Sequence, residues 1–560
     1  MQQMDAATRA ERLERMAGAT YDVLIIGGGI TGAGIALDAA SRGMRTAVIE
    51  MQDFAAGTSS RSTKLVHGGL RYLKQLEVKM VAEVGKERAI VYENGPHVTT
   101  PEWMLLPLYQ GGTFGRFSTS LGLRAYDFLA GVKRAERRSM LSAEEALRRE
   151  PLLRKEGLLG GGYYVEYRTD DARLTIEVLK EAVRQGADAI NYVKAEQLRY
   201  DAQGKVCGAQ VRDVRSGAAH ELRAACVVNA AGPWVDRLRE QDGSRSGKML
   251  RLTKGVHLVF DGGRFPLRQA VYFDTPDGRM LFAIPRAGKT YVGTTDTLYE
   301  ADPAHPLVTE QDQDYVLRAA GAMFPGLELQ ADDVESSWAG VRPLIYQEGK
   351  SPSEISRRDE ILTAPSGLIT IAGGKLTGYR KMAEHVTDLL AQRLQQGGQG
   401  TFGACRTKRM PLSGGDVGGA AKLPERLAEW TEAGVALGLP RAAAARLARR
   451  YGSNTPIVYA QLPQQPLPAS QAPGELPPDW AAELSYAVRC EMAATPLDFF
   501  MRRTGALLFD IAAVHRWKEA VLRVMTGALS YTAREEREHR ASLERALEEA
   551  AHPAALAEEG

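Results

Sequence analysis

A glycine-rich turn near the start of the chain places the strongest constraint on its fold. Residues 27–32 read GGGITG and fit the spacing GxGxxG. The apolar, β-branched residues 21–26 before the turn are typical of a buried parallel strand, and residues 30–43 after it have helical character. Residues 44–50 predict a second strand, so the segment is one βαβ unit of about 30 residues. In that context the turn predicts a dinucleotide-binding site.

The residue types in this unit suit a pyrophosphate and a ribose. Gly27, Gly29 and Gly32 let the backbone turn tightly and approach the phosphates, while the helix directs its first N–H groups at the negative charge. Glu50 ends the second predicted strand. A carboxylate there can accept hydrogen bonds from ribose hydroxyls and would repel a 2′-phosphate.

A second glycine turn favours a flavin over a nicotinamide cofactor. Residues 369–375 read ITIAGGK and place two glycines between an apolar strand and a predicted helix. The isoalloxazine end of FAD lies far from its pyrophosphate, and a late turn at a helix start can offer it backbone N–H groups. The turn favours FAD without by itself excluding NAD.

The bulk composition excludes several classes of function. The net charge is +2 and the chain is 25% charged and 44% apolar, which gives no global attraction for nucleic acid. The four cysteines, Cys207, Cys226, Cys405 and Cys490, form no CxxC pair, so we expect neither a metal site nor a disulfide framework. The first 22 residues contain no apolar core of a secretory signal, and no segment predicts a membrane span.

Several ordered motifs follow one another along the chain: GTSSRSTKLVHGGLRYL (57–73), VVNAAGPW (227–234), RLTKGVHLV (251–259), IPRAGKTYVGTTDT (284–297), AGVRPL (339–344), ISR (355–357) and AGGKLTGYRKMAE (372–384). Together they resemble the family of FAD-dependent glycerol-3-phosphate dehydrogenases. The resemblance covers residues from about 20 to 390 and continues into the C-terminal helices. The family belongs to the larger group of amine and hydroxy-acid flavin oxidases.

The resemblance implies an α/β fold with a Rossmann-like FAD-binding domain, an antiparallel-sheet substrate domain and a C-terminal α-helical domain. We expect a short N-terminal helix in residues 1–20 and the oxidoreductase region in residues 21–395. Within it, the FAD-binding segments are about 21–110, 165–250 and 340–395, and the substrate-domain segments are about 110–165 and 250–340. Residues 396–560, which read almost entirely as helix after Trp480, form the C-terminal domain.

The resemblance also implies which residues contact FAD. The loop that wraps the pyrophosphate and reaches the flavin is expected to use hydroxyls and backbone N–H groups. Beyond Gly27, Gly29, Gly32 and Glu50, the expected contacts are Ser59, Ser60, Thr63, Lys64, Leu65, His67, Val193, Ala230, Gly232, Trp234, Gly374, Lys375, Leu376 and Thr377.

The substrate implied by the resemblance is sn-glycerol 3-phosphate. Arginine is suited to a phosphate dianion because its planar guanidinium stays charged and offers several donors. The residues expected in the substrate pocket are Arg71, Tyr72, His257, Arg342, Arg357 and Lys375. Arg358 follows directly, and we prefer Arg357 because the family pattern is Ser-Arg.

The implied reaction oxidises the C2 alcohol to the ketone of dihydroxyacetone phosphate, with hydride passing from C2 to flavin N5. His257 is the first candidate for the base that accepts the hydroxyl proton, and Lys375 is the second if its pKa is depressed. Arg342 is the candidate for stabilising a developing alkoxide. Both residues also have a structural interpretation. A histidine on a strand can serve packing or hydrogen bonding, and a lysine at a helix start can bind the helix start or a carbonyl group.

The implied electron acceptor is a membrane quinone. We expect a cytoplasmic protein bound peripherally to the inner face of the cell membrane, with the basic residues 116–138 as a candidate contact with anionic lipid. A homodimer is left open. Three alternatives remain: a glycerol-3-phosphate oxidase that uses oxygen, an amino-acid or hydroxy-acid oxidase, and a flavin-binding scaffold or sensor without turnover. The oxidase is disfavoured because no inserted segment of about fifty residues, which the resemblance would require for it, precedes residue 390.

Overall fold

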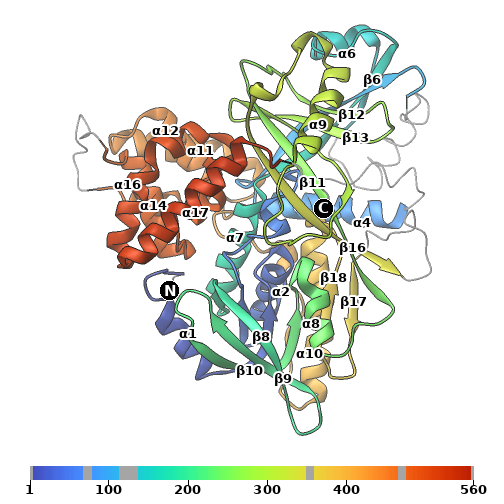
Figure 1. The fold of residues 1–560 in the computed structure, drawn as a ribbon. Coiled ribbons are helices and arrows are strands. Elements are labelled where there is room, and N and C mark those ends of the chain that lie inside the picture. Colours follow the sequence, from blue (N-terminus) through green and yellow to red (C-terminus); the bar gives the residue numbers. More distant parts are fainter. Residues whose placement is uncertain (1–3, 67–77, 113–136, 348–358, 464–473, 556–560) are drawn as a thin grey trace.

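The computed structural model describes residues 4–66, 78–112, 137–347, 359–463 and 474–555. Two sheets and a group of C-terminal helices make up this part of the chain (Figure 1). Helix α1 (Arg9–Ala17) precedes the first strand and contacts the first sheet at β10 and β7. The expected fold class is confirmed.

The first sheet is built on parallel strands. Its order is β17-β18-β10-β1-β2-β7, with the hairpin β8–β9 attached to β10. Strands β1 (Thr20–Ile26), β2 (Thr46–Ile49), β7 (Asp188–Ile190), β10 (Ala219–Asn229) and β18 (Ile369–Ala372) run parallel, and β17 (Glu360–Thr363) pairs antiparallel with β18. Helices α2 (Ile30–Ser41), α7 (Asp171–Arg184) and α10 (Tyr379–Gln396) pack around it.

The glycine turn joins β1 to α2, as the sequence predicts. β1 is an interior strand between β2 and β10, and its side chains are buried from Val23 onward in the core cluster that also includes α2. Burial on both faces explains the continuous apolar run. Residues 193–229 add the strands β8 (Val193–Tyr200), β9 (Val206–Asp213) and β10 to this sheet.

The second sheet is mainly antiparallel and has the order β15-β11-β14-β13-β12-β4-β6-β3, with β16 paired to β11 and β5 to β6. Its strands are β3 (Leu65–Val66), β4 (Thr99–Tyr109), β5 (Ser139–Leu141), β6 (Leu158–Thr169), β11 (Lys248–Asp261), β12 (Ala270–Asp274), β13 (Met280–Arg286), β14 (Lys289–Gly293), β15 (Thr297–Leu298) and β16 (Val334–Gln347). The antiparallel strands predicted within residues 250–300 are therefore confirmed. Strands β4 and β6 were not predicted.

The C-terminal helices form one side of the molecule, where they contact α7 and the strand β16 (Figure 1). They are α11 (Leu423–Ala436), α12 (Arg441–Tyr451), α13 (Thr455–Tyr459), α14 (Pro478–Glu491), the π-helical turn η11 (Asp498–Arg503), α15 (Ala506–Phe509), α16 (Ile511–Leu529) and α17 (Ala533–Ala551). Two apolar clusters hold this group together, one around Phe499 and one around Tyr451. In the described part of the chain, no helix combines the length and apolar character needed to cross a bilayer.

Candidate functional site

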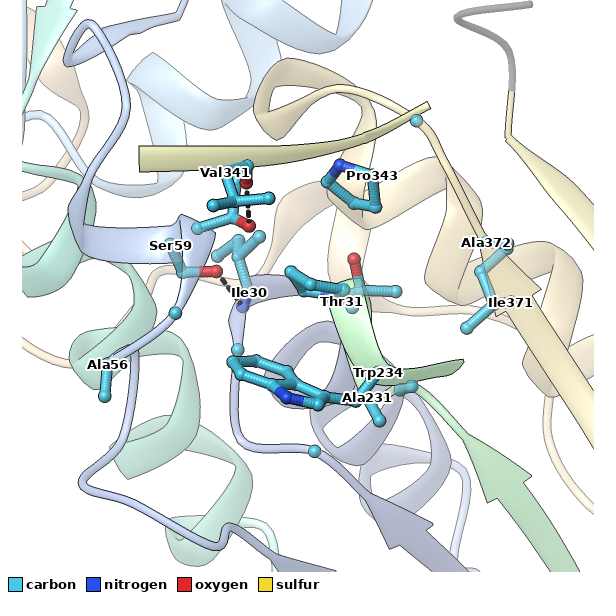
Figure 2. A pocket seen from close by; sticks show the side chains of 18 of the residues that line it. Ile30, Thr31, Ala56, Ser59, Ala231, Trp234, Val341, Pro343, Ile371 and Ala372 are labelled. Atoms are coloured by element: carbon cyan, nitrogen blue, oxygen red, sulfur yellow. Dashed lines mark hydrogen bonds between the residues drawn. The ribbon is translucent and has the colours of Figure 1, made fainter. Parts of the chain in front are cut away.

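A cavity of about 600 Å³ is walled by segments of both sheets. Its size suits a cofactor or a ligand of that class. The wall includes the carboxyl ends of β1, β2 and β18, where open α/β sheets bind their ligands, and the middle of β16 from the second sheet. Figure 2 shows side chains from the turn, the loop that follows β2, β16 and β18 around the same space.

The first glycine turn brings the backbone to the cavity wall because no side chain obstructs it. Gly27 has a φ of 121°, and a Cβ there would overlap the carbonyl oxygen of Ala230. A Cβ at Gly32 would overlap the carbonyl oxygen of Gly27, so the helix can begin this close to the strand only with glycine. The backbone N–H of Ile30, in the first turn of α2, donates to Ser59 Oγ at 2.9 Å (Figure 2). This end of the cavity offers the positive end of a helix to an anion.

Glu50 lies on the wall immediately after β2. Its Oε2 accepts from the N–H of Gly28 at 2.8 Å, and its Oε1 accepts from the N–H of Gln52 at 2.9 Å. Burial raises the pKa of this carboxyl, and the backbone donors partly oppose that effect. The remaining lone pairs of both oxygens are the acceptors that a ribose would use.

The loop 57–65 is fastened to its surroundings by its hydroxyl groups. Thr58 Oγ1 donates to the carbonyl oxygen of Val341 on β16 at 2.7 Å (Figure 2). Ser62 Oγ donates to Asp171 Oδ2 at 2.7 Å, at the start of α7. Lys64 is buried, and its Nζ donates to Asp171 Oδ1 at 2.6 Å and to the Ser60 carbonyl at 2.9 Å. The loop therefore joins the two sheets at the cavity.

The opposite walls come from three other segments. Val193 begins β8, Ala230 and Gly232 follow β10, and the ring of Trp234 lies against Gly57. The second glycine turn adds Gly374, Lys375, Leu376 and Thr377 at the carboxyl end of β18. Gly373 and Gly374 have φ values of 71° and 84°, which are unfavourable for other residues.

Arg342 projects from β16 and lines the cavity. Its Nη2 donates to Thr294 Oγ1 at 2.6 Å, and its Nη1 donates to the Thr295 carbonyl at 2.9 Å and lies 3.3 Å from Asp296 Oδ1. The loop after β14 thus fixes the direction of the guanidinium, whose side chain stays 28% exposed. A partly exposed, oriented guanidinium is suited to bind an anion.

His257 lies on β11, buried directly behind the wall. Its ring stacks on Trp338 with centroids 4.5 Å apart, and its Nε2 is 3.0 Å from Thr63 Oγ1. Burial, then the charges of Arg342 and Lys64, hold its pKa well below the usual value, so the imidazole is neutral near pH 7. Thr63 lines the cavity and connects this imidazole to it.

Most of the expected residues that the structure describes meet at the cavity. Four of them lie behind its wall instead: Gly32, Ser60, Lys64 and His257. His67, Arg71, Tyr72 and Arg357 lie outside the described residues, as do residues 116–136 of the basic segment. The roles assigned to all of these side chains remain predictions.

Several wall residues were missed by the sequence analysis. Ser62 lies within the motif SSRST, and Thr58 directly precedes it. The run of serine and threonine residues could therefore have indicated both of them. Lys194 and Glu196 follow Val193 on β8 and carry no motif. β8 pairs with β9 and lies close to β2, and only this tertiary arrangement places the two side chains at the cavity.

The arrangement fits FAD. It combines a glycine backbone at a helix start for a pyrophosphate, a carboxylate for a ribose and a distant glycine turn for the flavin edge. Among the described residues, no group of three or more His, Cys, Asp or Glu side chains could hold a metal ion.

Comparison with known proteins agrees with this geometry. Residues 22–380 match the family described as FAD dependent oxidoreductase, and residues 405–536 match the C-terminal domain of alpha-glycerophosphate oxidase. The chain is 60% identical to the aerobic glycerol-3-phosphate dehydrogenase of Bacillus subtilis (strain 168), over 98% of this chain and 99% of that protein. It is 58% identical to the protein of that name from Staphylococcus haemolyticus (strain JCSC1435), over 95% of each chain.

Two solved structures extend the comparison. The glycerol-3-phosphate dehydrogenase of Bacillus halodurans, crystallised with FAD, superimposes with a TM-score of 0.84 at 50% identity, over 99% of this chain and 100% of that chain. The L-alpha-glycerophosphate oxidase of Mycoplasma pneumoniae matches with a TM-score of 0.55 at 17% identity, over 69% of this chain and 97% of that chain. At 17% identity, the match to the Mycoplasma pneumoniae oxidase shows a shared fold and nothing more.

Proposed function

The chain belongs to the FAD-dependent oxidoreductases and, among them, to the aerobic glycerol-3-phosphate dehydrogenases, and from this premise we propose how it oxidises sn-glycerol 3-phosphate to dihydroxyacetone phosphate. The observation that carries the proposal is the match along nearly the whole chain to relatives of that name, joined to a cavity that has the features FAD requires. The residues that would hold FAD are the two glycine turns, Glu50 and the loop 57–65. When bound, FAD supplies the two-electron redox chemistry by accepting the hydride from C2.

Arg342 binds the anionic end of the substrate or the oxygen that develops charge at C2. Its guanidinium is oriented by Thr294 and Thr295 before any ligand arrives, so little reorganisation is needed. Arg71 and Arg357 would add to the phosphate site. Lys375 stands at the second glycine turn, where the flavin edge and the substrate would meet.

His257 accepts the hydroxyl proton through Thr63. The Thr63 hydroxyl takes the proton from the substrate and passes its own to Nε2 of the neutral imidazole, 3.0 Å away. Support for this route comes from the short distance between Nε2 and Thr63 Oγ1 and from Thr63 being the wall residue in front of the ring. The lowered pKa of His257 keeps the imidazole neutral and able to accept a proton, although it also makes the ring a weaker base.

The proton route is tested in single-turnover experiments without oxygen. We expect Thr63→Val and His257→Ala each to slow flavin reduction by about a hundredfold, the lower range for general base catalysis. Thr63→Ser keeps the hydroxyl and should stay near the wild-type rate. Wild-type rates in both Thr63→Val and His257→Ala would rule out the route, and a slow His257→Ala with an unaffected Thr63→Val would point to direct contact with His257.

The substrate is tested by anaerobic titration of the holoenzyme. Glycerol 3-phosphate should bleach the flavin absorbance at a stoichiometry of one substrate per flavin, while amino acids and hydroxy acids should leave it unchanged. Bleaching by one of the latter would replace the proposal with the corresponding oxidase. Lack of bleaching by every compound would support a non-catalytic flavoprotein.

We propose a membrane quinone as the electron acceptor and the inner face of the cell membrane as the site of action. The word aerobic in the relatives' names supports a respiratory role, whereas the match of residues 405–536 to an oxidase domain keeps oxygen as the competing acceptor. The reduced holoenzyme should be reoxidised much faster by a soluble quinone analogue than by air-saturated buffer. The opposite order would assign the protein to the oxidases.

A further inference from the structure

The loop between Glu50 and Ser59 contains a buried carboxylate that no part of the redox chemistry uses. Asp53 is 1% exposed and lies between the residue expected to bind the ribose and the residue that binds the start of α2. A buried carboxylate is costly unless it is paired and hydrogen-bonded. The groups that pair with Asp53 therefore help to hold the loop in its position.

The partners of Asp53 come from the C-terminal helices. Arg503 makes a bidentate pair with it, with Nη1 2.7 Å from Oδ2 and Nη2 2.9 Å from Oδ1. Arg502 Nε donates to Oδ2 at 2.5 Å, and Asn191 Nδ2 donates to Oδ1 at 2.9 Å. Both arginines belong to the π-helical turn η11, and both are buried.

Both arginines also donate hydrogen bonds to other residues of the C-terminal helices. Arg503 Nη2 also donates to the carbonyl oxygen of Glu491 at the end of α14, at 2.7 Å. Arg502 Nη2 donates to Asp498 Oδ1 at 2.7 Å. The guanidinium groups are therefore held by the C-terminal helices whether or not Asp53 is present.

Residues of the loop that contains Asp53 also contact the glycine turn directly. Phe54, next to Asp53, is fully buried, and its ring fills the space beside Gly28 that a Cβ would need. The backbone N–H of Ala55 donates to the carbonyl oxygen of Gly28 at 3.1 Å, while Glu50 Oε2 accepts from the Gly28 N–H. Further along, Ser59 Oγ accepts from Ile30 (Figure 2). The same few residues thus hold both sides of the turn.

We propose that Arg502 and Arg503 are positioning residues for FAD, and that they act through Asp53 on the loop that carries Glu50 and Ser59. The C-terminal helices are then part of the cofactor site, although they supply no residue to the described wall of the cavity. The proposal rests on FAD as the cofactor and not on the identity of the substrate.

The physical reason is the cost of an unpaired charge. Removing Arg503 takes away the bidentate partner of the buried Asp53 and leaves its charge compensated only by Arg502 and Asn191. The loop is then expected to move so that water can reach the carboxylate. Any such movement carries Phe54 and Glu50 away from Gly28. Burial by itself would raise the pKa of Asp53, and the two guanidinium charges reverse that effect, so the carboxylate remains ionised throughout the neutral range.

The test follows the release of FAD from diluted holoenzyme by its fluorescence. Arg503→Met should speed release by about tenfold, a size taken from the loss of affinity at metal sites when a partner that orients a ligating side chain is removed. Arg503→Lys keeps the charge but not the bidentate geometry and should give a smaller increase. Asp53→Asn should resemble Arg503→Met.

The matched control is Arg446→Met. Arg446 Nη1 donates to Glu483 Oε2 at 2.7 Å, and its Nη2 donates to Asp479 Oδ2 at 2.8 Å, between α12 and α14 of the same helical group. This pair does not contact the loop. Arg446→Met should lower the thermal stability as Arg503→Met does while leaving the FAD release rate at the wild-type value. Equal release rates in wild type, Arg503→Met and Arg503→Lys would overturn the proposal.

A measurement on the wild type keeps the proposal testable if the variants do not fold. Hydrogen exchange of the holoenzyme in low urea should show that residues 51–60 and 498–503 become exposed in the same opening event. If residues 498–503 open at a lower urea concentration while residues 51–60 stay protected, the C-terminal helices do not position the loop.

Discussion

At Gly32, the space available to a single residue decides whether a cofactor can bind. The helix α2 begins so close to β1 that a Cβ at this position would overlap the carbonyl oxygen of Gly27. The backbone would have to separate, and the N-terminal N–H groups of α2 would move away from the cavity. The requirement is steric, since the φ of Gly32 is not among the positive values of the chain.

Gly32→Ala should therefore yield a protein with little bound FAD. The flavin content of the purified variant, measured from its visible absorbance against protein concentration, checks this. Gly527→Ala in α16 is the control, because a Cβ there meets nothing within 4 Å. It should keep full flavin content and gain up to about 1 kcal/mol of stability from helix propensity. A Gly32→Ala protein with full flavin content would contradict the steric account.

His97 makes the stability of the protein depend on pH. It is buried, and neither ring nitrogen has a hydrogen-bond partner within the described residues. Burial lowers its pKa to about 4, against 6.5 in an unfolded chain, although the charge of Glu177 partly opposes the shift. The unfolded chain therefore takes up a proton near pH 6.5 that the folded protein takes up only near pH 4. Stability falls as the pH decreases through this window, by about 2 kcal/mol at pH 5.

His97→Leu removes this contribution. The melting temperature of the variant should fall less between pH 8 and pH 5 than that of the wild type. Differential scanning calorimetry of both proteins at the two pH values measures the difference. Parallel losses in the two proteins would show that other groups account for the acid sensitivity.

The candidate site was predictable from sequence where its residues act locally. The glycine turns and Glu50 have a spacing that local geometry requires, and the hydroxyl-rich loop is a recognisable motif. The pairing of Asp53 with Arg502 and Arg503 was not predictable, because it joins residues about 450 positions apart and depends on how the C-terminal helices pack. Nor does any local pattern indicate that His257 lies behind Thr63.

Among the elements, the strands β4 and β6 show where sequence patterns are least informative. β6 contains Gly160, Gly161 and Gly162, which weaken a strand signal, and β4 contains Pro101 and Pro107. The two strands nevertheless pair along eleven positions, because the second sheet buries their apolar residues on both sides. The βαβ unit was predictable, since its apolar runs and turn agree with its tertiary surroundings.

Gly160 of β6 is required by a close approach to β5. Gly160 has a φ of 140°, and a Cβ there would overlap the carbonyl oxygen of Leu141. Gly157, just before the strand, has a φ of 71° and no atom nearer than 3.9 Å to its Cβ position. Gly157→Ala should cost about 1 kcal/mol, the price of a left-handed residue, whereas Gly160→Ala should cost several times more. Thermal melting of the two holoenzyme variants compares them, and similar melting temperatures would contradict the predicted difference.

For the whole molecule, the C-terminal chain connects parts that are distant in sequence. After α17, the backbone of Ala554 runs parallel to Thr309, accepting from the Glu310 N–H at 3.2 Å and donating to the Val308 carbonyl at 2.8 Å. Ser337 Oγ on β16 donates to the carbonyl oxygen of Ala550 at 3.2 Å. The C-terminal helices thus contact both the first sheet, through Asp53, and the second sheet, through these residues. The three-part organisation of the chain remains a prediction, but its parts are not independent.

Deleting residues 552–560 tests the contribution of this contact. The deletion removes the two backbone hydrogen bonds of Ala554, each worth about 1 kcal/mol, so the variant should be about 2 kcal/mol less stable. The melting temperature should fall by a few degrees. Deletion of residues 556–560 alone keeps both hydrogen bonds of Ala554 and is the control. Equal melting temperatures for the two truncated proteins would show that the contact does not stabilise the molecule.

The distance in sequence between Asp53 and its arginines also sets the order of events during translation. Asp53 leaves the ribosome early, and Arg502 follows 449 residues later. At about 5–20 residues per second, that interval lasts about 20–90 s. The glycine turn and β1, β2 and α2 are therefore synthesised long before the arginines that hold their loop in place. If these arginines position the loop as proposed, the nascent chain binds its flavin less tightly during this interval, and tight binding follows only after residues 498–503 have been made and packed.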